Sequence, residues 1–275
     1  MEIKTVWGVF FSATGTTEKV VTGVAKTLAK LNNAECKFYS FNLPEARTRK
    51  LTFSKEDLVI LGIPVYAGRV PNLLSPFIRE KVFGNATLAT PITLFGNRSY
   101  DDALIELRNI MQKNGFCPVS AGAFVGEHSF STILGAGRPD ADDMALADQL
   151  AQETAKIVRS ISAPPTEAVS VRGNEPVGPF YVPRDRSGNP LNILKAKPKT
   201  DTAKCLDCGL CRNICPMGSI DPANVGEIPG VCIKCGACIK KCPAQAKYFD
   251  DKGYLYHRQD LEYTYSRRAG VELFY

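Results

Sequence analysis

The sequence lacks any apolar run near the ~20 residues of a membrane-spanning helix, and it has no dense run of lysine and arginine. The first absence argues against a membrane span. The second argues against nucleic-acid binding, although the formal net charge is +6. The apolar residues 6–11 are too few for a signal-peptide core, so we expect a cytoplasmic protein. No repeat of the solenoid type is present.

Strand and helix patterns alternate over the first 162 residues. Buried-strand patterns occur at residues 4–11 and 58–63, an alternating short strand at 36–41, and further strand patterns at 92–95 and 119–125. Helical patterns occur at residues 17–31, 72–82, 101–114 and 142–161. The alternation predicts an α/β fold with a five-stranded parallel sheet that helices cover on both faces. Such sheets bind ligands beyond the carboxyl ends of their strands, which points to loops 12–17, 64–71, 96–101 and 126–131.

The rest of the chain changes character. Residues 163–199 hold seven of the eighteen prolines but are too apolar for a free tether, so we expect a linker packed on a domain surface. Residues 200–275 are expected to form a small domain around eight cysteines, with an aromatic C-terminal tail. Within that tail, residues 250–253 predict a hairpin turn between aromatic strands. The tail rings either enlarge the small core or dock it on the first domain.

Ten cysteines without a secretion signal argue against disulfides. Cys36 and Cys117 stand alone in apolar surroundings and are expected to be core thiols. The other eight form two runs, residues 205–216 and 232–243, each with the pattern C-x-x-C-x-x-C-x-x-x-C-P. Zinc also binds Cys-x-x-Cys pairs, but two triple runs that each end in Cys-Pro indicate iron–sulfur clusters.

Residues 200–249 resemble the two-cluster bacterial ferredoxins throughout. In that pattern three thiolates of one run hold one [4Fe–4S] cluster, and the fourth cysteine crosses to the other cluster. The first cluster is then expected at Cys205, Cys208, Cys211 and Cys242. The second is expected at Cys232, Cys235, Cys238 and Cys215.

A hydroxyl-rich loop follows the first strand and leads into a helix. Its residues are Ser12, Ala13, Thr14, Gly15, Thr16 and Thr17. It lacks the Gly-Lys-Ser/Thr of a Walker loop, and neither G-x-G-x-x-G nor an acid ending strand two supports a dinucleotide fold. Hydroxyls and free N–H groups at a helix N-terminus suit a monophosphate dianion. A Ser/Thr-rich helix cap explains the loop equally well.

This Ser-Ala-Thr-Gly-Thr-Thr loop resembles the FMN phosphate loop of flavodoxins. The resemblance implies two loops around the flavin ring, formed by Pro64, Val65, Tyr66, Ala67, Gly68 and Arg69, and by Gly96, Asn97, Arg98, Tyr100 and Asp101. Tyr66 could stack on the ring, and Gly68 would let the backbone approach it. His128 is a further candidate, although it could simply brace its loop.

Two features depart from ordinary flavodoxins. The only tryptophan, Trp7, lies in the first strand and not in a flavin loop. The flavin loops also carry Arg69, Arg98 and His128, where flavodoxins tend to be acidic.

The whole chain resembles flavodoxin–ferredoxin fusion proteins. This implies a flavodoxin-like domain at 1–162, the linker 163–199, and a small α+β ferredoxin-like domain at 200–275. Bound FMN and two [4Fe–4S] clusters would largely balance the positive net charge. We expect electron transfer between FMN, the clusters and redox partner proteins. A flavin oxidoreductase that reduces a small acceptor and a cluster-based sensor are kept as alternatives, and the oligomeric state, including a homodimer, is left open.

Overall fold

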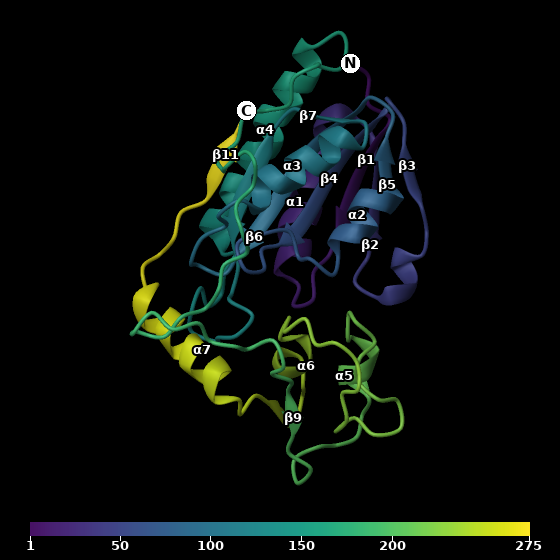
Figure 1. Ribbon diagram of the computed structural model, residues 1–275. Helices are drawn as coiled ribbons and strands as arrows, with labels where there is room; N and C mark the ends of the chain where they lie inside the picture. Colours follow the sequence, from purple (N-terminus) through teal and green to yellow (C-terminus); the bar gives the residue numbers. More distant parts are fainter.

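The computed structural model describes residues 1–275. It has two parts, an α/β domain and a smaller region that contains both cysteine runs, and the smaller region lies beneath one end of the sheet (Figure 1). Both chain termini lie on the α/β domain, away from the cysteine runs (Figure 1). None of the helices combines the length and the apolar character that crossing a bilayer requires.

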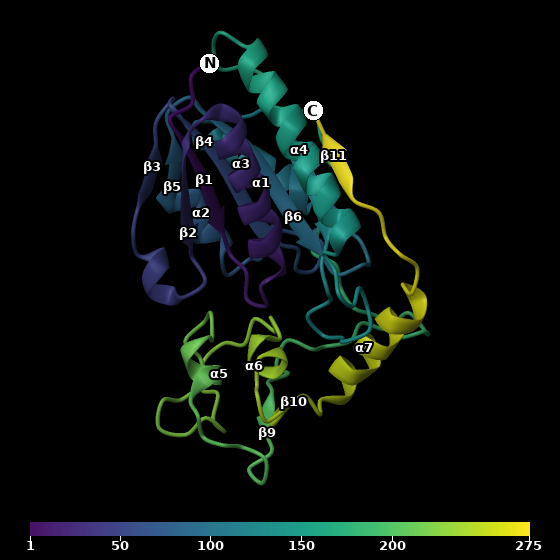
Figure 2. The same ribbon diagram turned by 180° about the vertical axis from the view of Figure 1, so that it is seen from behind.

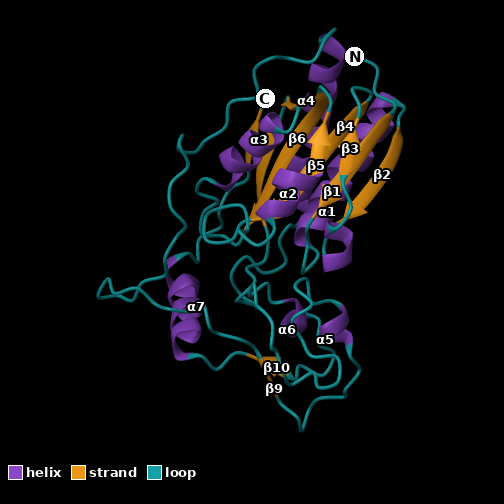
Figure 3. Ribbon diagram, turned by 45° about the vertical axis from the view of Figure 1, so that its right-hand side comes forward, coloured by secondary structure: helices purple, strands orange, loops and turns teal.

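The main sheet has seven strands, and five of them form its parallel centre (Figure 3). They are β1 (Thr5–Phe10), β2 (Glu35–Ser40), β4 (Asp57–Pro64), β6 (Thr87–Phe95) and β8 (Ala121–Val125). Their order, β2-β1-β4-β6-β8, is the 2-1-3-4-5 order of the flavodoxin-like doubly wound fold. The predicted fold class is therefore confirmed, although β6 begins five residues before the predicted strand.

Several short strands were not predicted. β7 (Phe116–Pro118) pairs with β6, and β3 (Leu51–Phe53) pairs with β5 (Val82–Gly84) in a separate small sheet. β11 (Glu272–Phe274), near the C-terminus, pairs antiparallel with β8 at the edge of the main sheet. The tail therefore extends the sheet of the first domain.

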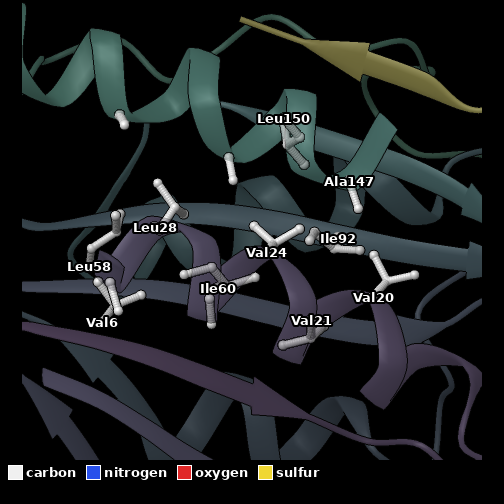
Figure 4. Packing of buried hydrophobic residues seen from close by; sticks show 14 of the residues in the cluster. Val6, Val20, Val21, Val24, Leu28, Leu58, Ile60, Ile92, Ala147 and Leu150 are labelled. Carbon is white, nitrogen blue, oxygen red and sulfur yellow. The ribbon is translucent and has the colours of Figure 1, made fainter. Parts of the chain in front are cut away.

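Helices cover both faces of the sheet. α1 (Thr16–Asn32) and α4 (Ala141–Ser160) lie on one face (Figure 2). The core beneath them includes Val24, Leu28, Ile60 and Leu150, whose side chains meet between helix and sheet (Figure 4). α2 (Ser75–Lys81) and α3 (Ala103–Lys113) pack on the other face through a second core cluster.

The predicted helix at residues 72–82 is too long. α2 begins at Ser75, with Pro76 in its first turn, and Val82 already belongs to β5. Proline fits the first turn of a helix, where its missing N–H costs no hydrogen bond, but not the interior. The proline therefore marks the start of the helix.

The cysteine region has little regular structure. It contains α5 (Leu210–Asn213), α6 (Ala237–Lys240) and the two-stranded pair β9 (Lys199–Thr200) and β10 (Lys247–Tyr248). The predicted hairpin at residues 250–253 is wrong, because α7 (Lys252–Thr264) starts there. The Asp251 carboxylate caps this helix by accepting the Tyr254 N–H at 2.8 Å, as expected for an N-cap aspartate.

Residues 174–181 of the linker contact the α/β domain. The Asp102 carboxylate accepts the N–H groups of Asn174 and Gly178 at 2.9 and 2.7 Å, and Tyr181 N–H donates to the Ala67 carbonyl. The aromatic tail both enlarges the core of the cysteine region and docks it on the first domain. Tyr254 stacks on Phe249 in the small core, and its ring also packs 4.5 Å from that of Phe130 in the first domain.

Cys36 and Cys117, expected to be buried core thiols, lie half-buried against the core between the sheet and α1 and α4.

Candidate functional site

The eight cysteines surround two cavities. Cys205, Cys208, Cys211 and Cys242 line the first, and Cys215, Cys232, Cys235 and Cys238 line the second. The fourth cysteine of each run thus lies with the first three of the other. Across the whole chain, no three or more His, Cys, Asp or Glu side chains gather closely enough to hold a single metal ion.

The two runs repeat the same backbone geometry 27 positions apart. Asp207 and Lys234 have φ of 47° and 58°, and Gly209 and Gly236 have φ of 69° and 75°. These left-handed residues make the tight turns that bring three thiols to one cavity. Behind each run, an N–H group donates to the fourth sulfur: Ser219 to Cys215 at 3.4 Å, and Ala246 to Cys242 at 3.3 Å.

The loop after β1 presents unpaired donors at the N-terminus of α1. Ser12 N–H donates to Asn42, and Glu18 N–H donates to the Ser12 hydroxyl. Between them, the backbone N–H groups of residues 13–17 donate to no acceptor in the protein, and the N-cap residue Gly15 has no side chain that could accept them. Such a helix N-terminus favours an anion through both its N–H groups and its dipole.

Four loops converge on a third cavity at the carboxyl ends of the strands. It is lined by Ala13, Thr14, Thr16, Thr17, Pro64, Val65, Tyr66, Leu94, Phe95, Gly96, Gly126, Glu127, His128, Ser129 and Cys235. The structure therefore brings together parts of all the predicted flavin loops. A Cβ at Gly96 would lie 2.3 Å from His128 Cδ2, so the close approach of these two loops requires glycine.

Tyr66 lines this cavity, and the thiols of Cys235 and Cys232 lie close enough to influence its phenol. Its N–H and carbonyl groups pair with those of Arg69 at 3.1 and 3.2 Å. Between them, Ala67 and Gly68 have φ of 51° and 76°, as in the tight two-residue turns of hairpins. Burial, reinforced by the thiols of Cys235 and Cys232, raises the pKa of Tyr66 well above its usual value. The phenol is thus neutral.

The two arginines of the flavin loops do not line the cavity. Arg69 binds the Glu106 carboxylate through Nε at 2.7 Å, and its guanidinium packs on the Phe180 ring. Arg98 forms an ion pair with Asp101 and lies over the Tyr181 ring. Each positive charge is therefore matched by a carboxylate and held against the linker.

Ser12, Gly15, Ala67, Gly68, Asn97, Tyr100 and Asp101 also do not line the cavity. Ser12 and Gly15 complete the loop before α1, and Ala67 and Gly68 form the turn after Tyr66. Tyr100 is fully buried, and its hydroxyl donates to Glu272 at 2.6 Å. Asn97 donates to the carbonyls of Tyr265 and Arg267 at 2.6 Å, and accepts the Ala269 N–H. Residues 96–101 therefore anchor the C-terminal tail.

His128 lines the cavity but does not carry the expected positive charge. Burial lowers its pKa to about 3, and the nearby charges of His257, Lys240 and Arg98 act in the same direction. Its Nδ1 accepts the Phe130 N–H at 3.1 Å, which requires an unprotonated nitrogen. The imidazole is therefore neutral at physiological pH, and it both braces its loop and faces the cavity.

Contacts missed by the sequence analysis join the cysteine region to the cavity. Lys240 on α6 forms an ion pair with Glu127 and donates to the carbonyls of His128 and Ser131 at 2.7 and 2.8 Å. A Cβ at Gly236 would lie 2.4 Å from the Ser129 carbonyl oxygen. Nothing in the sequence around Lys240 indicates this role. Glu127 and Ser129, in contrast, are direct neighbours of the candidate His128, and this position was a signal for including them in the site.

Cys235 belongs to both sites. It lines the cavity of the second cysteine set and also the cavity at the strand ends. The second cysteine set therefore lies next to the candidate flavin site.

Comparisons with known proteins agree with the two-part organisation. Residues 197–243 match the family model of the 4Fe-4S dicluster domain, which identifies that segment as an iron–sulfur domain. A comparison with curated proteins found no match.

Solved structures similar to this chain include two flavodoxins. One, from the domain Archaea, is 16% identical, with a TM-score of 0.42 over 57% of this chain and 99% of its own. The other, from Streptococcus pneumoniae TIGR4, is 18% identical, with a TM-score of 0.39 over 56% of this chain and 99% of its own. By its strand order and its cysteine segment, the chain joins a flavodoxin-like domain to a 4Fe-4S dicluster domain.

Proposed function

We propose that this protein transfers electrons between FMN, two [4Fe–4S] clusters and external redox partner proteins. The observation that carries the proposal is the position of Cys235, which lines both the second cysteine cavity and the cavity at the strand ends. One thiol then separates two redox sites in a single chain.

The residues present fit FMN. The unpaired N–H groups of residues 13–17 and the hydroxyls of Thr14, Thr16 and Thr17 would hold its phosphate. Residues 64–66, 94–96 and 126–129 would surround the ring. FMN, when bound, supplies a centre that exchanges two electrons, whereas each cluster exchanges one.

The chain's own residues fix the arrangement of these sites. Lys240 and Gly236 hold α6 against residues 127–131, and the Arg47 guanidinium donates to the Pro216 carbonyl next to Cys215. Ile233, between Cys232 and Cys235, packs against the core of the α/β domain. The cysteine region is therefore docked on the first domain by polar and apolar contacts, as an intramolecular electron path requires.

The same docking favours a carrier over an enzyme. The cysteine region contributes Cys235 to the wall of the cavity, so that part of the wall faces a second redox site and not solvent. Mixing the protein with NADH or NADPH and following flavin absorbance separates the two functions. A carrier shows no bleaching at a catalytic rate, whereas an NAD(P)H-dependent oxidoreductase does.

The main test is kinetic. Protein purified anaerobically should hold about eight iron atoms and one FMN, identified in a denatured extract. After rapid reduction of the clusters, the flavin should be reduced at a rate that does not depend on protein concentration. A rate proportional to concentration would show exchange between molecules and would refute the internal path.

A further inference from the structure

The two cysteine runs share their cysteine spacing and their backbone turns, and at one buried position only one of the two runs is followed by a charged residue. After the fourth cysteine, the first run reads Cys-Pro-Met-Gly-Ser-Ile and the second reads Cys-Pro-Ala-Gln-Ala-Lys. Ile220 and Lys247 are therefore equivalent positions, 27 residues apart like the cysteines themselves. Ile220 lines the second cysteine cavity, and Lys247 lines the first.

Lys247 is buried to an unusual degree for a lysine. The residue is 3% exposed, and its ammonium donates to the Val225 carbonyl. No carboxylate forms an ion pair with it. Burying a charge without a counter-charge is costly, so the structure needs an anion at this place. The group that would supply it is the cluster held by Cys205, Cys208, Cys211 and Cys242, which carries −2 with its four thiolates.

The cations near the second cluster differ in their exposure to solvent. Lys234 donates to the carbonyls of Leu194 and Cys232, and Arg47 donates to that of Pro216. Both residues are half-buried, so water and salt screen their charges more than that of Lys247. At the position equivalent to Lys247, the second cluster faces the uncharged Ile220.

We propose that Lys247 makes the cluster at Cys205, Cys208, Cys211 and Cys242 easier to reduce than it would be beside an apolar residue. The inference rests on the two-cluster function proposed above. Reduction adds one electron, taken from a flavin or an external one-electron donor, and changes the charge of the cluster with its thiolates from −2 to −3. A buried cation stabilises the reduced form more than the oxidised form, and the electron is drawn toward the cluster that has an exposed ligand, Cys208.

The test is a potentiometric titration of the whole protein, followed by electron paramagnetic resonance. Lys247→Met should lower the equilibrium constant for reduction of the first cluster at least tenfold, which is about 59 mV for one electron. The second cluster should shift less, because Lys247 lines the first cavity and not the second, and its charge acts on Cys238 of the second set only behind that set's neighbouring thiols. The Cys242→Ser variant, expected to keep only the second cluster, shows which potential belongs to which cluster.

Three control variants and a second neutral substitution isolate the effect of charge. Ile220→Met tests the equivalent apolar position, Lys241→Met removes an exposed neighbouring charge, and Lys247→Arg keeps the buried charge. All three should leave the first cluster within about threefold of the wild-type constant. Lys247→Gln repeats the neutral substitution with a polar side chain.

The outcomes separate this inference from the proposed function. The wild type could hold two clusters while neither neutral variant changes the equilibrium constant for reduction of the first cluster by more than twofold. In that case the Lys247 inference is overturned and the carrier function stands. A wild type without two clusters overturns both. Selective loss of the first cluster in both neutral variants, with Lys247→Arg intact, supports the pairing of this charge with that cluster.

Discussion

Lys240 and Glu127 form an ion pair across the boundary between the cysteine region and the α/β domain, and both side chains are largely shielded from solvent. The lysine stands on α6 between Cys238 and Cys242, and the glutamate stands on a loop that lines the candidate flavin cavity. The same ammonium also reaches two carbonyls of that loop. One side chain therefore links the position of a cluster to the shape of the flavin site.

Replacing Lys240 with methionine should loosen this docking. The Glu127 carboxylate and two carbonyls would lose their donor, a loss of about 1–3 kcal/mol. We expect a lower melting temperature and slower electron transfer from clusters to flavin in rapid-reduction experiments. Lys241→Met, which changes the exposed neighbour, is the matched control. Equal rates in the two variants would mean that the ion pair does not hold the path together.

Replacing Thr14 and Thr17 together with valine should weaken flavin binding. Both residues line the cavity at the unpaired N-terminus of α1, and valine removes their hydroxyls with little change in volume. We expect the Kd for FMN, measured by fluorescence titration, to rise at least tenfold. Thr22→Val, whose hydroxyl donates to Glu18 on the same helix, should bind normally. Unchanged affinity in the double variant would remove the phosphate assignment.

Cys242→Ser should damage the first cluster although it lies in the second run. Its sulfur lines the same cavity as Cys205, Cys208 and Cys211. Cys215→Ser is the reciprocal variant and should damage the second cluster. Iron analysis and electron paramagnetic resonance of the two variants should show complementary losses. Loss of the second cluster in Cys242→Ser would contradict the crossed ligand sets.

Asn97→Ala should release the C-terminal tail from the loop at residues 96–101. The asparagine side chain makes three hydrogen bonds to tail backbone groups, so the loss should be about 2–3 kcal/mol. Denaturant unfolding and hydrogen exchange in residues 265–274 measure it. Asn109→Ala, which removes an exposed hydrogen bond to Glu175, is the control. If the tail were equally protected from hydrogen exchange in both variants, the pairing of β11 with β8 alone would account for its docking.

Mild acid should destabilise the protein through its two histidines. Burial lowers the pKa of His128 to about 3 and that of His257 to about 4, from about 6.5 in the unfolded chain. As the pH falls from 6.5 towards 4, the unfolded chain binds protons that the folded chain does not, so stability decreases. Each histidine contributes at most about 1.4 kcal/mol per pH unit.

His128→Gln isolates one of these contributions. Unfolding free energies measured between pH 7 and 5 should depend less steeply on pH in this variant than in the wild type. Identical slopes would mean that His128 binds its proton in the folded state. Because carboxylates titrate in both proteins, the comparison cancels their contribution.

The sequence predicted the parallel sheet well, because hydrophobic runs are local signals. The spacing of the cysteines is also a local signal, and the grouping of the eight cysteines into two ligand sets stays a prediction that the serine variants above would test. The sequence could not show where Arg69 points, since its partner Glu106 is 37 positions away. The ion-pair partner of Arg98, Asp101, is only three positions away, but the Tyr181 ring that holds the guanidinium belongs to the distant linker. The helix α7 was missed because its aromatic residues favour strands. The spacing of Tyr254, His257 and Leu261, which are buried on one face, was the signal available.

The contacts between the linker, the tail and the loop at residues 96–101 could not be predicted from local sequence patterns. Tyr100 reads as a loop aromatic, yet it is buried beneath the tail because Glu272 accepts its hydroxyl. Asn97 similarly gains its role from tail backbone groups about 170 positions away. Such contacts form only when segments far apart in the sequence come together in the folded chain.

The pairing of β11 with β8 has a consequence for the newborn chain. During translation the five parallel strands leave the ribosome first, and the strand that covers the free edge of β8 is made after both cysteine runs. Until then β8 presents unpaired backbone groups, the kind of edge that recruits other chains. A contact so distant in sequence forms late. A pause in synthesis after the cysteine runs, or slow metal delivery to them, would therefore prolong the time for which the edge of β8 can pair with other chains.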